Sequence, residues 1–213
     1  MKPILWIVAG PNGAGKTTLV SREPVASLLP KVAFWNPDAL AKQILADRGF
    51  LGFANVPQDQ LRAAFVAAAD ATFANLKDCI SRGIPCGVET VLSTNKYREL
   101  VDAVLVERGI FGLLYVGLRS PEIACQRVAR RVLEKGHDVP QEKIVARWSR
   151  SLENLLWFAA KASPLLIFDN SDDDPRGSGK LIAEGHDGQV RWHDTNAIPE
   201  LSAALQSLSR FPA

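Results

Sequence analysis

The chain has 213 residues, 47% of them hydrophobic, which is enough for one domain with a sizeable buried core. Its 25 basic and 23 acidic side chains leave a formal net charge of +2, so bulk attraction to nucleic acid or to anionic lipid is not expected. No apolar run approaches the roughly 18–20 residues of a membrane span. The N-terminal sequence also lacks the pattern of a signal peptide, so we expect a cytoplasmic protein.

In chain order, the first half begins with an apolar run over 4–9, which is typical of a strand buried on both faces of a parallel sheet. A helix is expected over 15–22, a short strand over 31–35 and a helix over 38–48. A long alanine-rich helix is expected over 57–82, because its apolar residues recur every three or four positions.

The second half continues the alternation. A strand is expected over 85–91, a helix over 95–107, a strand over 110–118, and helices over 120–134 and 140–161.

A last core strand is expected over 164–168, followed by a polar loop over 169–178. A hairpin is expected over 180–193 and a terminal helix over 199–208. Strands that alternate with helices predict an α/β fold: a doubly wound, mostly parallel sheet with helices on both faces, in a single domain over 1–213.

The segment Gly10-Pro-Asn-Gly-Ala-Gly-Lys-Thr17 matches the P-loop pattern G-x-x-x-x-G-K-[ST] in full. Glycines let backbone N–H groups turn toward phosphate oxygens, the lysine reaches the β and γ phosphates, and the threonine hydroxyl coordinates Mg²⁺. An ATP–Mg²⁺ site is therefore predicted, with Thr17 as the metal ligand. Its nucleotide-binding residues are Gly10, Pro11, Asn12, Gly13, Ala14, Gly15, Lys16, Thr17 and Thr18.

Five arginines lie on the two helices expected over 120–134 and 140–161: Arg127, Arg130, Arg131, Arg147 and Arg150. Arginine-bearing helices joined by a short turn, here 135–140, can form a lid over a triphosphate. The alternative is that these arginines form a solvated helix face.

Three polar sites follow predicted strands, where ligands of doubly wound sheets bind. Asp38 is the best candidate for a general base; it could also simply be the N-cap of the helix that begins at Ala39, and the two roles can coexist. Glu89 and Thr90 occupy the equivalent end of the third strand and could also be a polar strand terminus. The loop 169–171 could meet the adenine or be a surface turn.

Taken together and in order, these motifs resemble the zeta-toxin-like P-loop kinases. The resemblance covers most of the chain up to Ser171 and rests on these segments: 9–18, 34–41, 89–90, 116–121, 127–132, 136–140, Arg147, 150–155 and 168–171.

The resemblance implies a kinase that uses ATP–Mg²⁺ to phosphorylate a hydroxyl group, which in the family's characterised toxins belongs to UDP-N-acetylglucosamine. It also implies toxin activity, although nothing in the chain indicates an antitoxin partner. The resemblance implies that Lys16 and Thr17 bind phosphate and Mg²⁺ and that Asp38 is the acceptor-activating base. It places Glu89 and Thr90 near the acceptor. Of the lid arginines that it places on the phosphates, we favour Arg131 and Arg147, with Arg127 as the next candidate.

Two other functions stay open. One is an ATP-binding switch or slow ATPase without a small-molecule acceptor. The other is a polynucleotide kinase, which would need a basic groove with stacking aromatic residues. Trp148, Trp157 and Phe158 lie near arginines, but on a helix these side chains are more typical of a core or a substrate cleft.

Overall fold

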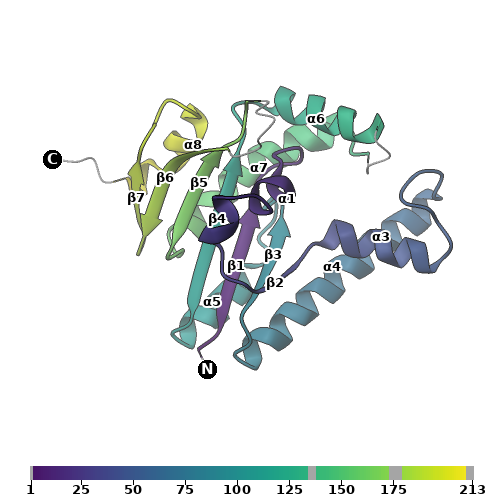
Figure 1. Cartoon of the computed structure of the whole chain (residues 1–213), viewed down its shortest axis with the longest axis horizontal. Coiled ribbons are helices and arrows are strands. Elements are labelled where there is room, and N and C mark those ends of the chain that lie inside the picture. Colours follow the sequence, from purple (N-terminus) through teal and green to yellow (C-terminus); the bar gives the residue numbers. More distant parts are fainter. Residues whose placement is uncertain (1, 134–137, 173–178, 210–213) are drawn as a thin grey trace.

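A computed structural model describes residues 2–133, 138–172 and 179–209 (Figure 1). Seven strands form one sheet in the order β2-β3-β1-β4-β5-β6-β7. The first five strands pair in parallel, whereas β6 and β7 add an antiparallel hairpin at one edge. The strands are β1 Ile4–Ala9, β2 Ala33–Trp35, β3 Cys86–Thr90, β4 Ile110–Gly117, β5 Leu165–Asp169, β6 Lys180–His186 and β7 Gln189–Trp192.

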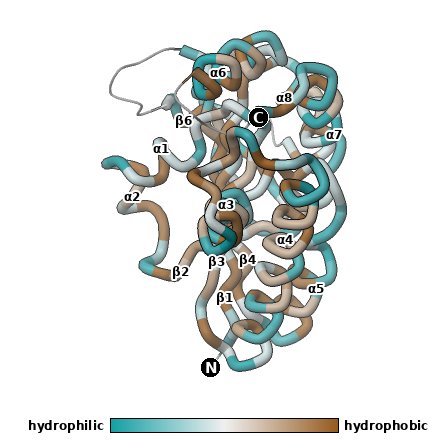
Figure 2. The backbone as a smooth tube through the Cα atoms, turned by 90° about the vertical axis from the view of Figure 1, so that its right-hand side faces the viewer, coloured by the Kyte–Doolittle hydropathy of each residue, from teal (hydrophilic) through white to brown (hydrophobic). Residues whose placement is uncertain are grey.

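Helices cover both faces of this sheet, as Figure 2 shows along its edge. One face packs mainly against α4, α5, α7 and α8, and the other against α1, α2 and α6. The helices are α1 Lys16–Val20, α2 Val25–Leu28, α3 Pro37–Asp47, α4 Gln58–Ser81, α5 Arg98–Val106, α6 Pro121–Leu133, α7 Gln141–Ala159 and α8 Pro199–Ala204, with a 3₁₀ turn at Gln206–Leu208. The predicted fold class is confirmed.

The first strand shows why the sheet is buried on both sides. Side chains alternate between the faces of a strand, so Leu5 and Ile7 enter one core layer while Trp6 and Val8 enter the other. All four are at most 5% exposed. The unbroken apolar run over 4–9 is therefore required by two cores rather than one.

Some boundaries differ from the sequence expectation. The first helix ends at Val20 rather than Arg22, and the short helix α2 follows it, too short to leave a periodic pattern. The terminal helix ends at Ala204 and continues as the 3₁₀ turn. The expected lid turn at 135–140 and polar loop at 169–178 lie partly outside the described residues.

Helices α3 and α4 pack against each other and project from one side of the sheet, while α6 lies near the carboxyl ends of the parallel strands (Figure 1). The carboxyl ends of β1 and β3 lie side by side because these strands are neighbours. In the part of the chain that the structure describes, no helix has the length and apolar character needed to cross a membrane.

Candidate functional site at the P-loop

The P-loop is held tightly against the neighbouring structure. Gly10 has φ +143°, and a Cβ atom there would lie 2.2 Å from the carbonyl oxygen of Val116 on β4. Gly13 has φ +73°, and a Cβ atom there would lie 2.7 Å from the carbonyl oxygen of Ala124 on α6. Both positions therefore need glycine for conformation and for space.

Lys16 is 8% exposed, and its ammonium group donates to the carbonyl oxygens of Gly10 at 2.8 Å and Pro11 at 3.1 Å. Burial lowers the pKa of Lys16, and the charge of Arg131 acts in the same direction, whereas the carboxylates of Glu89 and Asp38 oppose it. The structure therefore brings all three predicted site residues within electrostatic reach of the P-loop lysine.

The predicted metal ligand, Thr17, contacts a residue from another strand. Its hydroxyl group donates to Glu89, with both carboxylate oxygens 2.9 Å from Thr17 Oγ1. Thr17 itself is exposed, and Glu89 is half-buried at the end of β3. A hydroxyl and a carboxylate are hard oxygen donors of the kind that Mg²⁺ prefers, so the residues present fit this ion.

A cavity of about 760 Å³ opens beside the P-loop, a size typical of small-molecule sites. It lies between the projecting α3–α4 hairpin and the start of α7. Asn12 and Asp38 line it, and the Oδ1 atom of Asn12 is buried without a hydrogen-bond partner among the described residues. The remaining lining residues are Gln58, Asp59, Leu61, Arg62, Phe65, Val91, Lys143 and Arg147.

Asp38 is not the cap of its helix. Helix α3 begins at Pro37, and the side chain of Asn36 accepts hydrogen bonds from the backbone N–H groups of Asp38 and Ala39. The alternative role as N-cap is therefore wrong, because the asparagine two residues earlier already satisfies these donors. The Asp38 carboxylate is exposed and lines the cavity instead.

The predicted lid arginines take different places. Arg147 lines the cavity with Asp38, while the charge of Arg131 reaches Lys16. The guanidinium group of Arg127 donates to the carbonyl oxygens of Asn170, Ser171 and Asp172, at 2.6 Å, 3.2 Å and 3.0 Å. Arg127 thus holds the loop after β5.

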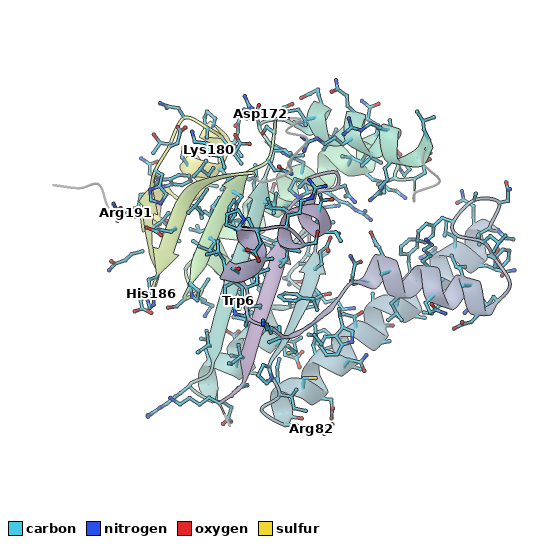
Figure 3. All side chains as sticks on the ribbon, in the orientation of Figure 1. Trp6, Arg82, Asp172, Lys180, His186 and Arg191 are labelled. Carbon is cyan, nitrogen blue, oxygen red and sulfur yellow. The ribbon has the colours of Figure 1, made fainter. Side chains whose placement is uncertain are left out.

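The same loop is attached to the P-loop. The amide of Asn170 donates to the carbonyl oxygen of Ala14 at 2.8 Å. Asp169 accepts from the backbone N–H and the hydroxyl of Ser171 and lies 3.7 Å from Arg119 Nε. Asp172, labelled in Figure 3, pairs with Arg119 as well. The loop 169–172 is therefore held beside the P-loop by hydrogen bonds and ion pairs rather than being a free surface turn.

Thr90 is the last residue of β3 and begins a tight bend. Its hydroxyl group accepts a hydrogen bond from the N–H of Leu92 at 3.3 Å, and Leu92 has the left-handed φ of 61°. Val91, between them, lines the cavity. Thr90 therefore shapes this edge of the cavity.

Two aromatic residues of α7, Trp157 and Phe158, pack away from this cavity. Phe158 is fully buried, and Trp157 stacks against the cationic groups of Arg98 at 4.9 Å and Lys161 at 4.8 Å. Neither side chain lines the cavity.

Sequence reasoning missed four charged or aromatic residues of the cavity: Asp59, Arg62, Phe65 and Lys143. The first three lie on α4, where they belong to an ordinary amphipathic pattern. Their role depends on the position of α4 opposite α7, which the sequence pattern does not reveal.

No protein-family model and no curated protein matches the chain. Solved structures do share its fold. The AvrRxo1-ORF1:-ORF2 complex with ATP is similar at a TM-score of 0.69 and 16% identity, covering 98% of this chain and 77% of that one. The fold is that of the zeta-toxin-like P-loop kinases. The expected resemblance is thereby confirmed at the level of the fold.

Two further structures agree with this result. The PezAT chromosomal toxin–antitoxin system of Streptococcus pneumoniae gives a TM-score of 0.62 at 14% identity, covering 99% of this chain and 81% of that one. The Pnkp1/Rnl/Hen1 RNA repair complex gives 0.51 at 14% identity, covering 72% of this chain and 45% of that one. This fold is thus shared by proteins of different biological settings.

Proposed function

We propose that the protein transfers the γ-phosphoryl group of ATP to a hydroxyl group of a small molecule, with UDP-N-acetylglucosamine or another sugar derivative as the acceptor. The observation that carries this proposal is the cavity that Asn12 of the P-loop and Asp38 line together. A nucleotide held by the P-loop and an acceptor held in this cavity would meet at Asp38.

In this proposal, the residues around the P-loop and the cavity have distinct roles. Asp38 accepts the proton of the acceptor hydroxyl at its carboxylate and orients that oxygen toward the phosphoryl group. Lys16, Arg131 and Arg147 offset the negative charge of the phosphates. Mg²⁺ bound with ATP would offset negative charge on the phosphates, and Thr17 is the residue that would hold it.

The cavity also favours an acceptor with an anionic part. Three cationic side chains, Arg62, Lys143 and Arg147, line it against two carboxylates, Asp38 and Asp59. Since Arg147 is assigned to the phosphates of ATP, Arg62 and Lys143 are available to a phosphate or carboxylate of the acceptor. Phe65 adds an apolar surface, and its ring stacks on Phe53 with 5.5 Å between centroids.

ADP release by the purified protein tests this function. We expect release to depend on both ATP–Mg²⁺ and UDP-N-acetylglucosamine, and to be lost in Asp38→Asn and Lys16→Ala. Asp47→Asn, at the other end of α3, is the matched control and should behave as wild type. If Asp38→Asn keeps full activity, the assignment of the base is wrong. If no hydroxyl acceptor stimulates release, the protein is an ATP-binding switch or slow ATPase.

Structures similar to this chain were solved as AvrRxo1-ORF1:-ORF2 and as part of a toxin–antitoxin system. This likeness supports toxin activity and a partner protein here as well. Growth of cells that express the wild type, compared with cells that express Asp38→Asn, tests it. Arrest by both proteins would show an effect unrelated to phosphoryl transfer.

A further inference from the structure

The end of β3 places an acidic residue next to the P-loop. Cys86, Gly87 and Val88 are buried, and Glu89 follows them. Because β3 pairs in parallel with β1, Glu89 lies opposite Val8 and Thr90 lies opposite Ala9, one residue before the P-loop. A short strand beside the P-loop strand therefore carries a carboxylate one residue before its end.

That carboxylate faces the metal-binding hydroxyl. Thr17 Oγ1 is 2.9 Å from both oxygens of Glu89, although the two residues are 72 positions apart. P-loop proteins hold Mg²⁺ through this hydroxyl group and an aspartate at the end of a buried strand. A cation bound by Thr17 would therefore lie next to the Glu89 carboxylate.

Other carboxylates near the P-loop have different surroundings. Asp169 accepts two hydrogen bonds from Ser171, and Asp38 lines the acceptor cavity. Among residues 2–133, 138–172 and 179–209, no group of three or more histidine, cysteine, aspartate or glutamate side chains could hold a metal alone. A Mg²⁺ ion held here would therefore need nucleotide oxygens or waters as its other ligands.

We propose that Glu89 is a positioning residue for Mg²⁺, acting with Thr17 in the place that an aspartate takes in other P-loop proteins. This inference rests on the proposed ATP site. It assigns Glu89 to the metal rather than to the acceptor, which is the role that the family resemblance implies. Thr90 and Asp38 are then the residues at the acceptor side.

The assignment predicts opposite effects with and without the metal. When Mg²⁺ is absent, the Glu89 carboxylate repels the triphosphate, so Glu89→Gln should bind ATP at least as tightly as wild type in EDTA. With Mg²⁺ present, the variant loses a partner of the ion. Loss of such an outer partner weakens metal binding by about 10- to 100-fold.

Displacement of a fluorescent ATP analogue by ATP, in Mg²⁺ and in EDTA, measures the two affinities. We expect the Mg²⁺ enhancement of wild type to fall about tenfold or more in Glu89→Gln and in Thr17→Val. Asp38→Asn is the matched control, because it also removes a carboxylate that acts on Lys16, and it should keep the enhancement. Binding of Mn²⁺ to the protein–ATP complex, followed by electron paramagnetic resonance, should weaken in the same two variants.

The outcomes separate this inference from the proposed function. An unchanged Mg²⁺ enhancement in Glu89→Gln, with a raised KM for the acceptor, would overturn the metal role and leave the kinase intact. Equal loss of ATP affinity in Mg²⁺ and in EDTA would show a structural effect and also overturn it. If the wild type does not bind ATP at all, the proposed function itself fails.

Discussion

A buried chain of hydrogen bonds joins β4, α7 and Val91 at the edge of the cavity beside the P-loop, and it gives a sharp test of the packing. Ser151 Oγ lies 2.8 Å from the carbonyl oxygen of Val91 and 2.9 Å from the hydroxyl oxygen of Tyr115. A carbonyl can only accept, so Ser151 donates to Val91 and Tyr115 donates to Ser151. Burial raises the pKa of Tyr115 well above its usual value, so this hydroxyl stays protonated.

These hydrogen bonds predict unequal losses of unfolding free energy when Tyr115 or Ser151 is replaced. Tyr115→Phe removes one hydrogen bond and leaves the bond to Val91 intact, which costs about 0.5–1.5 kcal/mol of unfolding free energy. Ser151→Ala leaves two buried groups without partners, each at about 1–3 kcal/mol, and we expect a loss of about 2–4 kcal/mol because Val91 is only half-buried. Adding Tyr115→Phe to Ser151→Ala then removes an unpaired hydroxyl group, so the double variant should be more stable than Ser151→Ala.

Urea unfolding followed by circular dichroism measures the free energy of unfolding of the wild type, the two single variants and the double variant. The free energies should rank wild type, Tyr115→Phe, double variant and Ser151→Ala from most to least stable. A double variant less stable than Ser151→Ala, or costs that simply add, would refute the proposed donor order.

Three further predictions concern residues that pack around the P-loop and its neighbouring strands. Gly10→Ala should lower the free energy of unfolding by about 1–3 kcal/mol and abolish ATP binding, because its Cβ would lie 2.2 Å from the carbonyl oxygen of Val116. Unchanged ATP binding would contradict this. Asn170→Ala should lower the free energy of unfolding in urea by about 1 kcal/mol, because it removes the hydrogen bond to the carbonyl oxygen of Ala14. A variant as stable as wild type would refute this prediction. Cys86 is buried with its pKa raised to about 12, so a thiol reagent at neutral pH should label it only after unfolding.

Local patterns predicted the strands and helices well because each depends on nearby residues. The apolar run of β1 and the alanine-rich period of α4 are both confirmed within a residue or two. Short elements were less visible, since the four residues of α2 cannot show a helical period.

The candidate site was only partly visible in the sequence. The P-loop and Asp38 stand out because a motif or a strand end marks them. The Thr17–Glu89 contact was not predicted, because it depends on the pairing of β3 with β1. A search for a strand ending in aspartate also overlooks β3, which contains a glycine and ends near a glutamate.

Detection of the phosphorylated acceptor tests the central claim most directly. The purified protein is incubated with ATP–Mg²⁺ and UDP-N-acetylglucosamine, and the acceptor is analysed by mass spectrometry beside an Asp38→Asn sample of equal ATP affinity. We predict an acceptor heavier by one phosphoryl group with wild type and an unchanged acceptor with Asp38→Asn. The same product in both samples would contradict the role of Asp38, and no product with any sugar or nucleotide acceptor would contradict the kinase.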